Sequence, residues 1–188
     1  MFARTERLLL RPGWSEDAPA LYEAIRDQGI VRNLATAPWP YQLSDAEAFL
    51  ARERGPNEAA CLIFLRTRGA PKLIGGIGIG RMPEGGHELG YWIARPYWGL
   101  GFATEAGRAV IDIARHGLRL KRLEAGHFLD NPASGRVLRK LGFKPTGGVA
   151  ERYSAGRRAE APCRLFELAL AGETALVDAG EEACAMAA

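Results

Sequence analysis

The most informative part of the chain runs Glu88-Leu-Gly-Tyr-Trp-Ile-Ala-Arg-Pro-Tyr-Trp-Gly-Leu-Gly-Phe-Ala-Thr-Glu-Ala106. It reads as a strand, a glycine-rich turn and the start of a helix. A turn built on Gly99 and Gly101 leaves backbone N–H groups uncovered, and the helix behind it adds partial positive charge at its N-terminus. The pattern predicts a binding loop for a phosphate or pyrophosphate. A tight turn that binds no ligand is the alternative interpretation of the same two glycines.

Two familiar glycine loops do not fit this stretch. A P-loop has a Lys followed by Ser or Thr after its last Gly, whereas Gly101 is followed by Phe102-Ala103-Thr104. A dinucleotide-binding loop has the pattern G-x-G-x-x-G, and Thr104 occupies its last glycine position. The sequence therefore argues against both ligand classes.

A third loop fits better. The run Trp98-Gly-Leu-Gly-Phe-Ala103 resembles the acyl-CoA pyrophosphate loop of the GNAT N-acetyltransferases, Arg/Gln-x-x-Gly-x-Gly/Ala, at both small positions. Trp98 departs from that pattern, which prefers Arg or Gln there. The wider stretch is similar to the Rim-type branch, which contains ribosomal-protein acetyltransferases. The opening run Thr5-Glu-Arg-Leu-Leu-Leu-Arg-Pro12 also looks like the start of that branch.

A second signature follows in the family order. The run Asn131-Pro-Ala-Ser134-Gly-Arg-Val-Leu-Arg-Lys140-Leu-Gly-Phe143 resembles the family pattern Asn-x-x-Ser leading to Lys-Leu-Gly-Phe. Read physically, Asn131 is a good helix N-cap, Pro132 suits the first helical position and Gly142 ends the helix. Together the two signatures extend the resemblance over about residues 4–170.

The resemblance implies a fold and a co-substrate. The fold is α/β, with a mixed, mostly antiparallel sheet that splays between its fourth and fifth strands, here residues 87–94 and 121–128, and flanking helices. The co-substrate is acetyl-CoA, whose pantetheine arm lies in the gap. The residues expected to bind it are Trp92, Ile93, Trp98, Gly99, Leu100, Gly101, Phe102, Ala103, Thr104, Asn131 and Arg136.

The resemblance also assigns the chemistry. Glu88 matches the strand Glu that serves as base in several relatives; a surface Glu paired with a neighbouring Arg is the alternative. His127 is a weaker candidate base. Its appeal is the near-neutral pKa of a His, and an ordinary half-exposed His is the alternative. Many relatives protonate the CoA thiolate with a Tyr at the position of Leu138, so that acid is excluded here. Ser134 is the remaining candidate, although its hydroxyl is also suited to bonding backbone in the first helical turn.

Basic residues of the same helix are candidates for the 3′-phosphate of CoA. Arg136, Arg139 and Lys140 lie there, and a solvated helix face is the alternative for all three. Trp98 is expected either to pack on the core or to shield the co-substrate. The acceptor side is expected to involve residues 28–43 and 153–163. Trp39 and Tyr41 in the first segment either stack on the acceptor or anchor the loop. Arg152, Arg157 and Arg158, in and beside the second segment, either attract an acidic acceptor or are ordinary surface charges.

Composition narrows the class of protein. The chain has 188 residues, 47% hydrophobic and 25% charged, which suits a globular domain. No apolar run is long enough for a bilayer, and no signal peptide is recognised, so we expect a cytoplasmic protein that does not contact a membrane. The three cysteines and three histidines lack zinc spacing, so no metal site is expected. Nucleic-acid binding is not favoured, since charge alone supports it.

Two parts of the chain differ in charge. Residues 171–188 contain four acidic and no basic residues, so a net charge of +3 leaves +7 on residues 1–170. We expect residues 1–170 to form one acetyltransferase domain and residues 171–188 to form a mobile Ala/Gly-rich tail. A basic body suits the polyanion CoA. A homodimer is suggested by the family resemblance alone.

The predicted function is direct transfer of acetyl from acetyl-CoA to a primary amine in a ternary complex. The acceptor is either a protein N-terminus or a small-molecule amine. A non-catalytic acyl-CoA sensor with the same fold is the alternative.

Overall fold

The computed structural model describes residues 2–170, so the predicted acidic tail lies outside the described residues. Eight strands form one sheet in the order β1-β2-β3-β4-β5-β6-β8-β7. The strands are β1 (Ala3–Arg4), β2 (Leu8–Arg11), β3 (Ala59–Leu65), β4 (Lys72–Arg81), β5 (His87–Ile93), β6 (Arg122–Phe128), β7 (Lys144–Ser154) and β8 (Ala159–Ala169). All neighbours pair antiparallel except β5 and β6, which are parallel. The mixed, mostly antiparallel sheet is as predicted.

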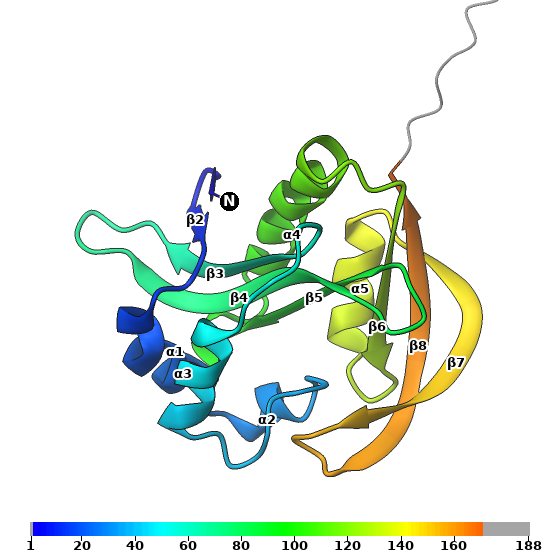
Figure 1. Cartoon of the computed structure of the whole chain (residues 1–188), viewed down its shortest axis with the longest axis horizontal. Helices are drawn as coiled ribbons and strands as arrows, with labels where there is room; N and C mark the ends of the chain where they lie inside the picture. The colour runs from blue at the N-terminus through cyan, green and yellow to red at the C-terminus, as the bar shows by residue number, and fades with distance from the viewer. Residues whose placement is uncertain (1, 171–188) are drawn as a thin grey trace, which may run out of the picture.

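Five α-helices connect and cover the strands. They are α1 (Ala18–Ile25), α2 (Gln28–Val31), α3 (Leu43–Ala51), α4 (Phe102–Asp112) and α5 (Pro132–Lys140). A π-helical turn, Ile113–Gly117, continues α4. In Figure 1, the long curved hairpin of β7 and β8 lies beside α5.

The sheet opens between β5 and β6. A single residue pair, Glu88 with Glu124, joins these two strands near their beginnings. Beyond that pair the strands diverge, as Figure 1 shows. The backbone groups on the inner edge of β5 therefore lack the ladder partners that buried backbone normally finds. The predicted splay is confirmed, and it leaves a gap in the middle of the molecule.

Alternation along the strands builds a core on each face of the sheet. On β3, Ile63 joins the core beneath α4 and α5, whereas Leu62 and Phe64 join the core beneath α1 and α3. The same alternation divides β5. Leu89 and Ile93 are buried on the α4 and α5 face, and Trp92 packs toward the opposite one. Consecutive side chains of β5 thus lie on opposite faces of the sheet.

The strands predicted for residues 87–94 and 121–128 match β5 and β6 to within one residue at each end. At the start of α3, Gln42 is the N-cap and Asp45 closes the capping box. The sequence reading missed the four-residue helix α2, whose N-cap Asp27 accepts a bond from the backbone N–H of Gly29 at 2.7 Å.

Within residues 2–170, no helix has both the length and the apolar character needed to cross a membrane. In the same range, no group of three or more Cys, His, Asp or Glu residues is arranged to hold a metal ion.

Candidate active site

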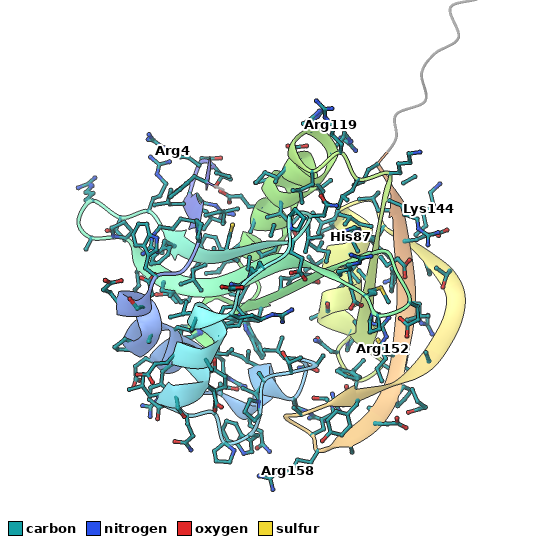
Figure 2. The ribbon with its side chains drawn as sticks, viewed as in Figure 1. Arg4, His87, Arg119, Lys144, Arg152 and Arg158 are labelled. Carbon is teal, nitrogen blue, oxygen red and sulfur yellow. The ribbon has the colours of Figure 1, made fainter. Side chains whose placement is uncertain are left out.

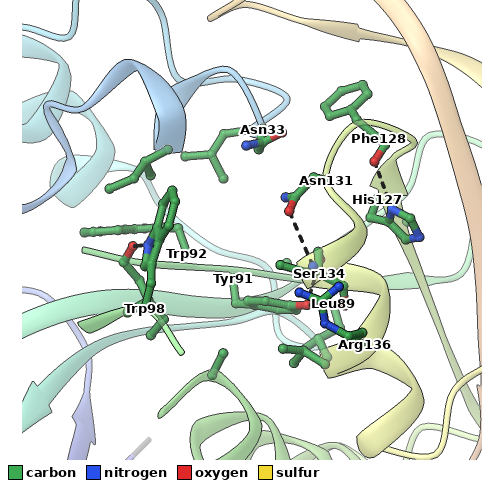
Figure 3. A pocket seen from close by; sticks show the side chains of 18 of the residues that line it. Asn33, Leu89, Tyr91, Trp92, Trp98, His127, Phe128, Asn131, Ser134 and Arg136 are labelled. Atoms are coloured by element: carbon green, nitrogen blue, oxygen red, sulfur yellow. Dashed lines mark hydrogen bonds between the residues drawn. The ribbon is translucent and has the colours of Figure 1, made fainter. Parts of the chain in front are cut away.

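A cavity of about 510 Å³ occupies the gap between β5 and β6 (Figure 3). Its loop end is formed by the glycine loop and α5. The residues lining this end are Trp98, Gly99, Gly101, Phe102, Ala103, Thr104, Ser134, Arg136, Val137 and Lys140. Its hairpin end is formed by α2 with the segment after it, by the start of β5 and by the β7–β8 hairpin. The residues lining that end are Gly29, Ile30, Asn33, Leu34, Ala35, Glu88, Arg152, Tyr153 and Cys163.

The glycine loop has the backbone conformation that its sequence requires. Gly99 and Gly101 have φ of 76° and 83°, in the left-handed region that favours glycine. Gly101 is the N-cap of α4 and supplies no side chain, so the first N–H groups of the helix remain available for a ligand. A Cβ at Gly99 would meet nothing within 4 Å. The loop lines the cavity with backbone that no side chain covers, and it therefore suits an anion.

The outer side of the loop is tied to the N-terminal segment. Arg7 donates to the carbonyl of Leu100 at 3.1 Å and pairs with Glu105 of α4 at 2.6 Å. Its guanidinium also lies 4.5 Å from the ring centre of Phe102. Leu100 itself does not line the cavity, because its side chain points outward and is 54% exposed. The fixed outer side leaves the inner side free for binding.

The inner edge of β5 presents backbone groups to the gap. The N–H of Ala94 donates to Ile74 on β4 at 2.8 Å. Since successive residues direct their backbone groups to opposite strand edges, the N–H of Ile93 faces the gap. The carbonyl of Ile93 accepts a bond from the indole Nε1 of Trp98 at 2.6 Å. Trp98 is 45% exposed at the cavity rim, so it lies outside the core. Trp92 lines the cavity as well.

Tyr91 and Ser134 form a hydroxyl pair between β5 and α5 (Figure 3). The Tyr91 hydroxyl lies 2.7 Å from Ser134 Oγ and 3.1 Å from the Ser134 carbonyl oxygen. Burial raises the pKa of Tyr91 to about 12, and the hydrogen bond to Ser134 only partly opposes this. The phenol therefore stays protonated at neutral pH. Sequence reasoning found Ser134 but missed Tyr91, because the contact joins residues 43 positions apart.

Helix α5 and its N-cap carry four more residues that the sequence analysis singled out. Asn131 caps the helix through its side-chain oxygen, which accepts a 3.4 Å bond from the Ser134 N–H. Arg136 and Lys140 line the loop end of the cavity. Arg139 instead lies over the ring of Phe166, 5.6 Å from its centre. Two of the three basic residues thus line the cavity, although both are exposed, so the solvated-face alternative stays open for them.

Glu88 lies at the hairpin end, where it forms an ion pair with Arg152 of β7 (Figure 2 labels Arg152). The two side chains are 32% and 29% exposed. Burial lowers the pKa of Arg152, but the charge of Glu88 and the hydrogen bond to it raise that pKa overall. The geometry is therefore compatible with Glu88 as a base and with Glu88 as an ion-pair partner, because its carboxylate lines the cavity and is also paired with an arginine.

Comparison with known proteins identifies the family to which this fold belongs. The model of the acetyltransferase (GNAT) domain matches residues 7–144. The chain belongs to the GNAT acetyltransferase family. The uncharacterized N-acetyltransferase YoaA of Bacillus subtilis is 30% identical over 156 residues, covering 79% of this chain and 85% of YoaA. The predicted family and the acetyl-CoA-dependent N-acetyltransferase class are confirmed at that level.

Solved GNAT structures share the fold. A GNAT-family acetyltransferase from Bacillus anthracis superimposes with a TM-score of 0.75 at 22% identity, covering 90% of this chain and 99% of that one. RimL, a ribosomal L7/L12 alpha-N-protein acetyltransferase solved in complex with coenzyme A, gives a TM-score of 0.72 at 18% identity, covering 90% and 98%. The Rim-type resemblance therefore extends to the fold of this GNAT chain.

His127 has a packing environment. Its ring is buried and lies 5.5 Å from that of Phe166, and its Nδ1 is 2.9 Å from the Phe128 carbonyl oxygen. A Cβ added at Gly135 of α5 would come within 2.5 Å of His127 Nε2. The glycine is thus what lets α5 approach the ring. Although His127 lines the cavity, these contacts favour a structural role.

A polar clamp holds the hairpin end together. Arg157 pairs with Asp130 at 2.7 Å, and Arg32 pairs with the same carboxylate at 2.7 Å. Ser154 donates to the carbonyl of Leu34 at 2.8 Å. These bonds fasten the segment after α2 to the β7–β8 hairpin and to the end of β6. They place α2 over the cavity, which no local sequence pattern predicted.

The two aromatic residues expected to line the acceptor side do not reach it. Tyr41 is 5% exposed and packs in the core beneath α1 and α3, and Trp39 packs against the same core. Neither lines the cavity. The anchoring alternative for these residues is the one that the fold adopts.

Proposed function

We propose that this GNAT chain transfers acetyl from acetyl-CoA directly to a primary amine, with donor and acceptor held together in the cavity. The observation that carries the proposal is the continuity of the cavity from the glycine loop, past the inner edge of β5, to Glu88. The donor would enter at the loop end and the amine at the hairpin end. Acetyl-CoA carries an activated acyl group, so the protein needs no nucleophile of its own.

The loop end has the groups needed to hold the donor. The open N–H groups of the loop and the first turn of α4 would bind its pyrophosphate. Arg136 and Lys140 would bind phosphate oxygens, because both reach the cavity from α5. Pantetheine amides would pair with the unpaired inner edge of β5, in the manner of an added strand. RimL, which shares the fold, was solved in complex with coenzyme A, and this supports acetyl-CoA as the donor.

Three groups would act on the reacting atoms. Glu88 would accept the proton that the ammonium must lose, directly or through water. The amine nitrogen would then attack the thioester carbon, and the N–H of Ile93 would stabilise the charge that develops on the carbonyl oxygen. As the C–S bond breaks, the hydroxyl of Ser134 would donate to the departing sulfur.

Tyr91 would decide which way the Ser134 hydroxyl points. The phenol has one proton, which it donates either to the Ser134 carbonyl oxygen at 3.1 Å or to Ser134 Oγ at 2.7 Å; in the second arrangement the serine proton is free for another acceptor. The phenol is protonated at neutral pH, since its ordinary pKa of 10 is raised by burial to about 12. Tyr91 is therefore a positioning residue that prepares Ser134 to donate.

The proposal is tested in two steps with the full chain. Acetyl-CoA and CoA should raise the apparent melting temperature by mass action, whereas NADH and ATP should leave it unchanged. A panel of peptides with free N-termini and of small amines should then release CoA thiol from acetyl-CoA. Binding without thiol release from any amine would favour the acyl-CoA sensor. Absence of a melting shift with either CoA form would contradict the proposal.

A further inference from the structure

Resting on the proposed function, we infer that the acceptor is a primary amine carrying an anionic group only a few bonds from its nitrogen. The observation is the ion pair at the hairpin end. Glu88 and Arg152 lie side by side on the cavity wall, one suited to an ammonium and the other to an anion. A zwitterion fits this pair charge for charge.

Arg152 is the one arginine of this region that faces the cavity. Arg157 is taken up by Asp130 and by the Arg32 carbonyl oxygen, to which it donates at 2.6 Å. Arg158 donates to the Trp39 carbonyl oxygen at 2.9 Å and lies at the outer tip of the β7–β8 hairpin (Figure 2). Neither of them lines the cavity. The acidic-acceptor expectation therefore rests on Arg152 alone.

The guanidinium of Arg152 retains donors for a ligand. Its Nη1 bonds Glu88, whereas its Nη2 and Nε have no hydrogen-bond partner among residues 2–170. A guanidinium presents its N–H groups as a planar fork that matches a carboxylate or phosphate. Gly126 of β6 lies beside this group: a Cβ there would be in ordinary contact with Nη1 of Arg152 at 3.5 Å, and its tight approach would be to Cys163 Sγ at 2.7 Å.

Charge balance gives the reason for an anion. An ammonium approaching Glu88 is repelled by the neighbouring guanidinium, and an anion on the same molecule cancels that repulsion. The nearby Glu124 is already paired with Arg122 at 3.2 Å. Because Glu88 and Arg152 touch, the two charges of the acceptor must also be close together. Amino carboxylates and amino phosphates share this chemistry, whereas a peptide N-terminus followed by neutral residues does not.

The test compares acceptors that differ only in charge. Each L-amino acid is paired with its primary amide, and 2-aminoethyl phosphate is paired with ethanolamine. We expect the wild-type chain to favour the anionic member of at least one series by about tenfold or more in kcat/KM, as for a hydrogen-bonded charge pair. The favoured series tells carboxylate from phosphate.

Variants locate the effect. Arg152→Gln should abolish the preference, because kcat/KM falls for the anionic member, whereas the neutral member loses the repulsion by the guanidinium and should not fall with it. Arg158→Gln, at the exposed hairpin tip, is the matched control and should keep the preference. The melting temperature of the CoA-bound protein with each acceptor gives a second readout that needs no turnover.

Each outcome decides the inference. Equal losses for both members in Arg152→Gln would mean that Arg152 only supports the structure, and would overturn it. The inference would also be overturned if no anionic acceptor reacted and none raised the melting temperature of the CoA-bound protein. So would a preference for neutral peptide N-termini. Acetyl transfer without charge preference would leave the proposed function standing, whereas loss of acetyl-CoA binding would remove the proposed function itself.

Discussion

The two ends of the cavity are built in different ways. The loop end is made from consecutive residues, in which two left-handed glycines and two helix starts present backbone N–H groups. The hairpin end is made from segments far apart in the chain, joined by ion pairs such as Glu88 with Arg152, 64 positions away. Under the proposed function, this contrast means that backbone groups would hold the constant donor, whereas side chains would select the variable acceptor. Four changes can break or sharpen that contrast.

The largest effect on the affinity for acetyl-CoA is expected at Gly99. Gly99→Ala forces a side chain into a left-handed conformation, at a cost of about 1–2 kcal/mol, at a loop residue that lines the cavity. The affinity for acetyl-CoA should fall about tenfold or more, as measured by calorimetry. Gly147→Ala is the matched control, because Gly147 has φ of 85° and open space but does not line the cavity. A similar loss of affinity in both variants would contradict a binding role for the loop.

The hydroxyl pair should come next. Ser134→Ala removes the proposed donor to sulfur and should lower kcat about tenfold, in line with one hydrogen bond to a charged group. Tyr91→Phe should lower kcat less, by about threefold to tenfold, because Ser134 remains but is no longer oriented. The KM for acetyl-CoA should change little in either variant. A rise in that KM with unchanged kcat would show that the pair only binds the donor.

Smaller effects are expected from the basic residues of α5. Arg136→Gln and Lys140→Gln should each weaken acetyl-CoA binding by a few fold at low salt, as exposed charge pairs contribute up to about 1 kcal/mol. The loss should shrink as salt is added. Arg139→Gln is the control, since Arg139 lies over Phe166 and does not line the cavity. Comparison of CoA with dephospho-CoA tells whether the 3′-phosphate is the partner.

The smallest effect concerns pH and the clamp at the hairpin end. The hydrogen bond from Arg157 holds the pKa of Asp130 below its ordinary value of 3.8, and burial only partly opposes it. A lowered folded pKa means that the stabilisation is present above about pH 4 and is lost as pH falls through the folded value. Asp130→Asn should therefore reduce thermal stability slightly at pH 7 and differ less from wild type below pH 4. A difference that grew on acidification would contradict this assignment.

The loop end could be predicted from sequence because its signals are local. Gly99, Gly101 and Asn131 each determine the backbone of their own turn, and all three lie where the motifs placed them. Leu100 belongs to the same loop, but its side chain is exposed and does not line the cavity. Neighbouring residues of a turn point their side chains in different directions, so the motif did not tell which of them face the ligand. The splay between β5 and β6 followed from the family resemblance rather than from periodicity.

The hairpin end could not be predicted in the same way. The contacts of Arg152, Tyr91 and Asp130 depend on chain segments brought together by the whole sheet, and no spacing in the sequence encodes them. Trp39 and Tyr41 looked like acceptor contacts because aromatic residues in a segment between elements suggest binding. Both residues instead pack in the core beneath α1 and α3.

The most direct test of the account is Glu88→Gln, with acetyl-CoA binding and acetyl transfer measured on the same preparation. The substitution keeps the size of the side chain and removes its ability to take a proton. We predict that the dissociation constant for acetyl-CoA stays within about twofold, whereas kcat falls by about 10²–10⁴, as for a general base. Unchanged turnover, or an equal loss of binding and turnover, would contradict the assignment of Glu88 to the acceptor and of the glycine loop to the donor.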